Sequence, residues 1–203
     1  MKKYRIIELS VAFAFIISAI ASVGAFANEC NNIRDNVIRL HILANSDSAE
    51  DQNIKLIVRD ELLKSGIGMF KGEMTVENSE RILKNNICEL KTLINDILEE
   101  NNFEYECDIY ITDEYFETRE YENFTMPAGR YKALKIILGE GKGHNWWCVM
   151  FPPLCLPAAK DNVNIDNVFN EKGVNIVTES DKYVFKFKII ELIEDIKIML
   201  SSK

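Results

Sequence analysis

The N-terminal apolar run decides which part of this chain can enter a folded core. It extends from Val11 to Ala27 and follows a positively charged start that contains Lys2, Lys3 and Arg5. A basic start, an apolar stretch and a small-x-small ending, here Ala25-Phe26-Ala27, form the pattern of an export signal. The sequence therefore predicts a signal peptide over residues 1–27 that is cleaved before Asn28.

A second interpretation keeps this run as an uncleaved membrane anchor. Glu8 lies at the start of the apolar region and leaves a hydrophobic block shorter than a usual membrane span, which favours the cleaved signal peptide. In both interpretations residues 28–203 lie outside the cytoplasm. We expect them to form a single domain, because no repeat, linker or low-complexity tract interrupts them.

The exported part is strongly acidic. The chain has a net charge of -8, and loss of three basic residues and one acidic residue with the signal peptide takes it to -10. Nucleic acids and anionic membrane surfaces attract clusters of Lys and Arg, and the sequence contains no such run. Hydrophobic residues make up 47% of the chain, which is enough for a core. We therefore expect a folded domain that binds no nucleic acid.

All five cysteines lie in the exported part, where disulfides are permitted. Cys148 and Cys155 are seven positions apart around Pro152-Pro153, a pair that can reverse the chain, and this predicts a disulfide between them. The other interpretation is two buried thiols in an apolar turn. Cys107 is predicted to be a core thiol.

Two segments near the start of the exported part predict a strand followed by a helix. Residues 37–44 alternate, so that Ile38, Leu40, Ile42 and Ala44 face the core and Arg39 and His41 share the other face. Asp47 with Glu50 resembles a helix N-cap and its reciprocal acid, which predicts a helix over residues 49–64.

The remaining elements complete an α+β fold. Residues 75–101 carry an apolar seam at helical spacing, with Cys88 on its polar flank. Strands are predicted within 103–112, 131–138, 146–151 and 184–187, the last merging into an amphipathic C-terminal helix. We expect a small, largely antiparallel sheet with helices packed on one face.

Several sets of residues suggest chemistry, but each has a simpler interpretation. The Gly-rich segment 139–143 precedes no helix and predicts a flexible turn, not a phosphate loop. Asp113, Glu114 and Glu117 lack a partner base and are interpreted as a solvated face. A zinc site would have to combine His144, Cys148 and Cys155 with the distant His41, so we predict no metal and no cofactor.

One catalytic alternative stays open, an exported cell-wall hydrolase or peptidase that uses Cys148 as nucleophile and His144 as base. Such chemistry needs a third group that orients the imidazole, and none is evident in the sequence. No catalytic residue is therefore predicted.

The two tryptophans of the chain are adjacent, at Trp146 and Trp147. In an extended segment they point to opposite faces, so one can fill the core while the other faces outward. With Phe151, Pro152 and Pro153 they form a large apolar surface of the kind that binds partners.

Three segments together resemble the stage II sporulation protein R family of endospore-forming bacteria. The first is IRLHILANSDS at 38–48, followed by Glu50-Asp51-Gln52, Lys55 and Val58-Arg59-Asp60. The second is Pro127-Ala128-Gly129 with Tyr131 and Ala133-Leu134, and the third is LGEG at 138–141 running into NWWCVMFPPLC at 145–155. His144 stands where a small residue is more usual in the family, which weakens a catalytic interpretation of this histidine.

The resemblance implies an intercellular signal and not an enzyme. Such proteins are exported from the forespore into the space between the two septal membranes. There they activate a membrane-embedded aspartic protease of the mother cell, which processes the precursor of an early mother-cell sigma factor. We expect the contact with this protease in three patches: Arg39, His41, Asn45 and Asp47; Arg59 and Asp60; and residues 145–155, including Asn145, Trp146, Trp147, Phe151, Pro152 and Pro153.

Overall fold

The structure is a computed structural model and describes residues 2–70, 75–152, 154 and 168–201. Internal contacts divide the chain into two compact units. Unit 1 comprises Met1–Arg34, Phe116–Gly129 and Phe169–Lys203, and unit 2 comprises Asp35–Tyr115 and Arg130–Val168. The single domain predicted over residues 28–203 stays a prediction.

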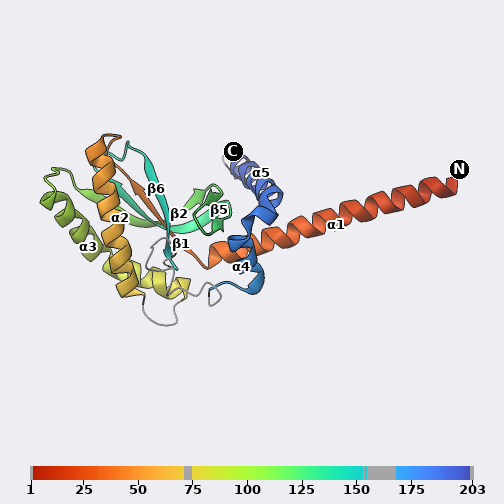
Figure 1. Cartoon of the computed structure of the whole chain (residues 1–203), viewed down its shortest axis with the longest axis horizontal. Helices are drawn as coiled ribbons and strands as arrows, with labels where there is room; N and C mark the ends of the chain where they lie inside the picture. Colours follow the sequence, from red (N-terminus) through yellow and green to blue (C-terminus); the bar gives the residue numbers. More distant parts are fainter. Residues whose placement is uncertain (1, 71–74, 153, 155–167, 202–203) are drawn as a thin grey trace. The chain divides into compact units, whose positions relative to one another are not determined.

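Unit 2 is built on a four-stranded sheet with the strand order β2-β5-β1-β6 (Figure 1). The strands are β1 (Ile38–Leu43), β2 (Cys107–Phe116), β5 (Gly129–Leu138) and β6 (Asn145–Phe151). β1 runs parallel to β5 and antiparallel to β6, so the sheet is mixed and the expectation of a largely antiparallel sheet is wrong for its central pair. A parallel pair needs a long crossover, and here two helices lie between β1 and β5 in the chain.

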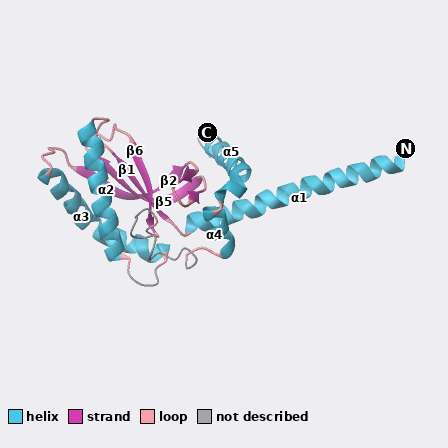
Figure 2. Cartoon of the chain, in the orientation of Figure 1, coloured by secondary structure: helices cyan, strands magenta, loops and turns pink. Residues whose placement is uncertain are grey.

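Two helices, α2 (Ala49–Met69) and α3 (Val76–Glu100), pack on one face of this sheet (Figure 2). The shared core combines the inward side chains of β1 with the apolar faces of both helices: Ile38, Leu40, Ile42, Ile54, Val58, Leu62, Leu83, Leu90 and Ile94. The predicted strand face and both predicted helices are therefore confirmed. Cys107 lies in the same core and Cys88 is exposed, also as expected.

The start of α2 differs from the prediction. The backbone N–H of Asp51 donates to Ser48 Oγ at 3.1 Å, so Ser48 caps the helix. The assignment of Asp47 as the N-cap is wrong, because its carboxylate accepts from the backbone N–H of His144 and Ser48 accepts from the N-terminal amide of α2. A serine at this position satisfies an N-terminal amide as well as aspartate does.

Unit 1 contains a long helix, α1 (Lys2–Asp35), with β3 (Arg119–Glu120), β4 (Thr125–Met126), α4 (Glu171–Thr178), the 3₁₀ helix η3 (Ser180–Tyr183) and α5 (Val184–Ser201). β3 and β4 form a small antiparallel pair. The strand predicted at residues 184–187 is wrong, since this segment opens α5. Phe187 and Ile190, three residues apart, are both buried on one face of that helix.

α1 has the character expected of a signal or an anchor. Its span Tyr4–Asp35 is long and apolar enough, by length and composition, to cross a membrane, and its most apolar part is not buried in the structure. Only the last turns of α1 enter the core of unit 1, through Phe26, Cys30 and Ile33.

Candidate functional site

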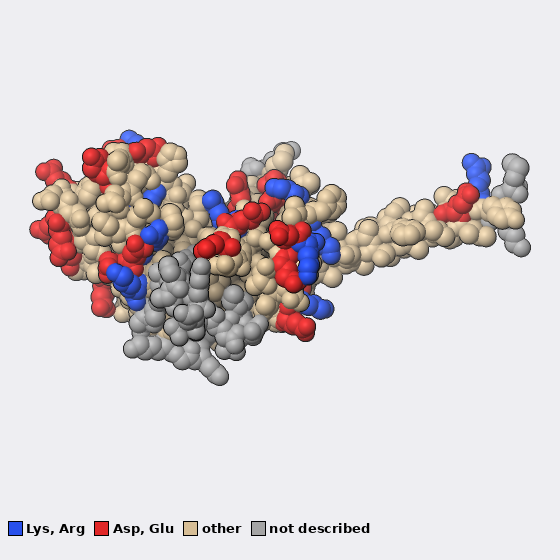
Figure 3. Space-filling model, in the orientation of Figure 1, with Lys and Arg blue, Asp and Glu red and all other residues tan. Residues whose placement is uncertain are grey.

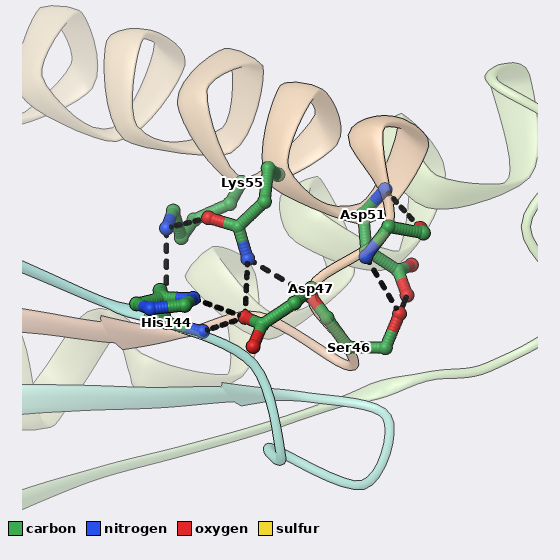
Figure 4. A network of polar contacts seen from close by, with 7 residues as sticks. Ser46, Asp47, Asp51, Lys55 and His144 are labelled. Atoms are coloured by element: carbon green, nitrogen blue, oxygen red, sulfur yellow. Dashed lines mark hydrogen bonds and ion pairs between the residues drawn. The ribbon is translucent and has the colours of Figure 1, made fainter.

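Two turns of unit 2 lie against each other beside the end of β1 (Figure 4). The first is the segment 45–48 between β1 and α2, and the second is the segment 139–144 between β5 and β6. They meet because β1 is paired with both β5 and β6. We call residues 45–48 and 139–145 the paired-turn surface.

Every backbone N–H group of the second turn donates a hydrogen bond to an acceptor in unit 2. Six consecutive N–H groups, from Gly139 to His144, donate in order to Glu106 O, Asn45 Oδ1, Leu138 O, Asn45 O, Ala44 O and Asp47 Oδ1. A phosphate-binding loop needs free N–H groups that point at the anion. The predicted turn between strands is confirmed, and its amides are all engaged by acceptors of unit 2, which leaves none of them to hold a phosphate.

Glycine is required at two positions in this turn. Gly139 and Gly141 have φ values of 55° and 62°, a region that other residues adopt only at a cost. A Cβ atom on Gly139 would also collide with the side chain of Asn45.

The first turn is held by the carboxylate of Asp51, a residue that is 5% exposed. Its oxygens accept hydrogen bonds from Ser46 Oγ at 2.5 Å, Tyr105 Oη at 2.5 Å and Asn45 Nδ2 at 3.0 Å. Burial opposes ionisation of Asp51, but these hydrogen bonds outweigh it and hold its pKa below the usual range. Asn45 thus bonds Asp51 with its nitrogen and the second turn with its oxygen.

Asp47 and Lys55 complete the link between the turns. Asp47 Oδ1 accepts from the backbone N–H of His144 at 2.6 Å and pairs with the imidazole of the same residue. The hydrogen bonds from His144 lower the pKa of Asp47. Lys55 Nζ donates to His144 O at 2.8 Å. The side chains of His144 and Asp47 are 78% and 55% exposed, so this link lies on the surface.

On the sheet face opposite to α2 and α3, His41 is enclosed by polar and aromatic partners. Its ring stacks on Trp147 with a centroid distance of 3.6 Å. Its Nδ1 lies 2.8 Å from Glu114 Oε2, and its Nε2 lies 2.9 Å from Asn145 Oδ1. Burial, which disfavours the imidazolium, lowers the pKa of His41 despite these hydrogen bonds.

The assignment of Glu114 to a solvated face is wrong. Its carboxylate accepts from Lys135 Nζ at 2.6 Å as well as pairing with His41, and its side chain is only 21% exposed. Sequence reasoning missed this residue because the predicted strand ended at Thr112, whereas β2 continues to Phe116. The period-two pattern, extended by one step from Thr112, was the signal that could have found it.

Trp146 lies on the other face of β6, as the sequence predicted for the tryptophan pair. The register places Trp147 opposite His41 and Trp146 opposite Ile42. Trp146 packs against the core of unit 2 and is covered by the guanidinium of Arg59, 4.4 Å from its ring centroid. Arg59 in turn pairs with Asp60 at 2.6 Å. Both tryptophans are half-buried.

The other predicted contact residues are less accessible. Arg39 is fully buried, and its Nε donates to Cys148 O at 3.0 Å. Phe151 is 6% exposed and packs edge-on against Phe70, and Pro152 is also buried. Pro153 and Cys155 lie outside the described residues, so the disulfide between Cys148 and Cys155 stays a prediction.

The two residues of the catalytic alternative lie in different environments. Cys148 is 1% exposed and belongs to the core of unit 2, whereas the imidazole of His144 is exposed and engaged by Asp47. Within the described ranges, no cluster of three or more His, Cys, Asp or Glu side chains could hold a metal ion. The paired turns carry exposed side chains, among them Asp47, His144 and Asn145.

Comparison with known proteins identifies relatives of this chain. The family model described as stage II sporulation protein R matches residues 34–161, a range that contains both turns. The protein named stage II sporulation protein R of Bacillus subtilis (strain 168) is 34% identical over 164 residues. This match covers 81% of the present chain and 68% of the relative. No solved structure matches.

Proposed function

Since this chain belongs to the stage II sporulation protein R family, we propose that it is an exported intercellular signal of endospore formation. It crosses the forespore membrane by means of its N-terminal apolar segment and acts in the space between the two septal membranes. There it binds and activates a membrane-embedded aspartic protease of the mother cell. That protease then processes the precursor of an early mother-cell sigma factor, and the signal itself is not an enzyme.

The observation that carries this proposal is the convergence of two segments of the chain. The segments 38–60 and 138–155 carry most of the family resemblance, and they meet in the paired-turn surface. The hydrogen bonds of Asn45, Asp51 and Lys55 fix its shape before any partner arrives. A preorganised surface loses little conformational entropy on binding, which suits a ligand that must shift a receptor between states.

The predicted contact residues then have three different roles. Asp47, His144 and Asn145 are exposed and contact the protease directly. Trp146 with Arg59, and Trp147 with His41, form the two aromatic flanks of the same surface. Buried Arg39 and Phe151 shape β1 and β6 from within. Activation follows if this surface binds the active state of the protease more tightly than the inactive state.

The proposal is tested by producing the protease and the sigma factor precursor in a host that does not sporulate, with or without this protein. We expect processing only when the protein is exported. Asp47→Lys should reduce the rate about tenfold, which corresponds to a loss of about 1.4 kcal/mol in binding. Asp108→Lys is the matched control, because Asp108 is 77% exposed on unit 2 but lies outside the surface. Processing that proceeds equally without the protein would refute the signalling function.

The alternative of an exported hydrolase or peptidase is tested by thiol alkylation of the folded, non-reduced protein. An enzyme that used Cys148 and His144 would have a reactive thiolate at Cys148. Burial of Cys148 in the core predicts that it resists alkylation. Rapid modification of Cys148 would favour the enzyme over the signal.

A further inference from the structure

Helix α5 of unit 1 has two apolar faces, and one of them is buried against other described residues of the unit. The inner face packs against the last turns of α1, where Phe187 meets Phe26 edge-on at 5.4 Å. Glu194 on the same face pairs with Arg34 at 3.6 Å. Phe187, Ile190 and Glu194 are all buried, so this face fixes α5 to the C-terminal end of α1.

The second face is an exposed apolar stripe. It consists of residues spaced by four, three, four and three positions, which places them on one side of a helix: Phe185, Ile189, Leu192, Ile196 and Met199. Phe185, Leu192, Ile196 and Met199 are 79%, 62%, 56% and 70% exposed. We call these five residues the outer stripe. Large apolar patches of this kind mark contact with another apolar phase or a partner.

The last turns of α1 are packed together with α5 in unit 1. The helix continues without a break through the predicted cleavage position between Ala27 and Asn28. Phe26, which cleavage would remove, is 4% exposed and stacks on Tyr183 at 5.5 Å. On the other side of the cleavage position, the Arg34 guanidinium donates to Ala128 O. Proteolysis favours exposed, loosely held backbone, whereas this position lies inside a helix whose neighbouring turns are packed.

The rest of α1 is suited to lipid. Its side chains between Val11 and Ala25 are almost all exposed and carry no charge, and charged side chains colour it only near its N-terminus in Figure 3. Phe26 and the residues that hold α5 follow this apolar run directly. A helix that crosses the bilayer with this run therefore places α5 at the membrane surface.

We propose that α1 is retained as a membrane anchor and that unit 1 rests on the lipid bilayer through the outer stripe of α5. The proposal depends on export as stated under the proposed function, but not on the identity of the protease. The anchor keeps unit 1 at the membrane across which the chain is exported, while unit 2 carries the paired-turn surface.

The charges of α5 favour lipid as the occupant of the outer stripe. The chain as a whole is acidic, but in α5 the lysines at 186, 188 and 197 offset the acids at 191, 194 and 195. The helix therefore brings no net negative charge to the headgroups. The contact is apolar, which is consistent with the lack of a basic run that anionic surfaces would require.

Retention of α1 is tested on the full chain produced in an endospore-forming host. Membranes are washed at alkaline pH, and the mass of the protein that remains is measured. We expect an intact N-terminal segment in the membrane fraction. A protein that begins at Asn28 and is released from the membranes would overturn the proposal.

Contact of the outer stripe with lipid is tested by spin labelling of the full chain in vesicles of phosphatidylethanolamine and phosphatidylglycerol. The label is placed by Leu192→Cys in a Cys88→Ser background, since Cys88 is exposed whereas Cys30 and Cys107 are buried. Lys197→Cys, on another side of the same helix and 61% exposed, is the matched control. Relaxation by oxygen, which concentrates in lipid, is compared with relaxation by a water-soluble nickel chelate.

We expect oxygen to relax the label at position 192 more strongly than the chelate, and the reverse at position 197. Weak relaxation by both reagents at position 192 would mean that protein, such as a second copy of this chain, covers the stripe. Strong relaxation by the chelate would mean that the stripe faces water. Either result overturns the proposal, and neither depends on sigma factor processing, so a failure here is distinguishable from a failure of the signalling function.

Discussion

The substitution Asp51→Asn tests whether the paired-turn surface is preorganised. The Asp51 carboxylate accepts three side-chain hydrogen bonds, from Ser46, Tyr105 and Asn45, at 2.5, 2.5 and 3.0 Å. Hydrogen bonds to a charged group contribute about 1.5–3 kcal/mol, against about 0.5–1.5 kcal/mol for neutral pairs. An amide of the same shape keeps at most one oxygen acceptor, so we expect unit 2 to lose about 2–3 kcal/mol.

The assay is urea unfolding of the full chain in detergent, followed by tryptophan fluorescence. Both tryptophans of the chain lie in β6, so the signal reports unit 2 alone. A loss of this size should lower the midpoint by about 1 M at an m-value of about 2 kcal/mol/M. Asp60→Asn is the control, because its ion pair with Arg59 is partly exposed and should contribute less than about 1 kcal/mol.

The difference in unfolding free energy between the original chain and Asp51→Asn should also depend on pH. The pKa of Asp51 is lowered in the folded state, so its stabilising effect is present above its ordinary value of 3.8 and is lost as pH falls through the folded pKa. The gap between the original chain and Asp51→Asn should therefore close in strong acid. If Asp51→Asn unfolds at the same urea concentration as the original chain at neutral pH, the hydrogen bonds of Asp51 do not hold the turns.

Three further results are expected. Gly143→Ala should destabilise unit 2 by about 1–3 kcal/mol, because the new Cβ collides with the backbone oxygen of Ser46; an unchanged thermal midpoint would contradict this. His41→Gln should flatten the loss of stability as pH falls below 6.5, since burial lowers the pKa of His41 and the folded state resists its protonation; equal slopes in both proteins would contradict it. Alkylation of the folded chain at neutral pH should modify exposed Cys88 well before Cys107, whose burial raises its thiol pKa to about 11, and equal rates would show that the core is open.

Local periodicity predicted most of unit 2. The alternation in residues 37–44 places Arg39 and His41 opposite to the core. The apolar seam of residues 75–101 predicts α3 with bounds that are wrong by one residue at each end. The adjacent tryptophans were assigned to opposite faces because a strand has a period of two, and the register of β6 confirms this. These features depend on neighbours in sequence, which a single sequence displays directly.

The features that the sequence predicts wrongly depend on contacts between distant segments. The sequence suggests a capping role for Asp47, because Glu50 is only three residues away whereas its actual partner His144 is 97 positions away. The sequence places Glu114 in solvent, because nothing local shows that His41 lies beside it. At residues 184–187 the alternation of apolar residues and lysines resembles a strand, but packing against the last turns of α1 selects a helix. The parallel pairing of β1 with β5 also follows from the crossover and not from either strand.

Photocrosslinking from the paired-turn surface during sporulation tests directly whether this surface contacts the protease. A photoreactive amino acid is placed at His144, whose side chain is 78% exposed, and in a matched strain at Asp108, which is 77% exposed outside that surface. We expect a crosslink from position 144 to the membrane-embedded aspartic protease and none from position 108. Equal crosslinking from both positions, or a partner at position 144 other than the protease, would contradict it.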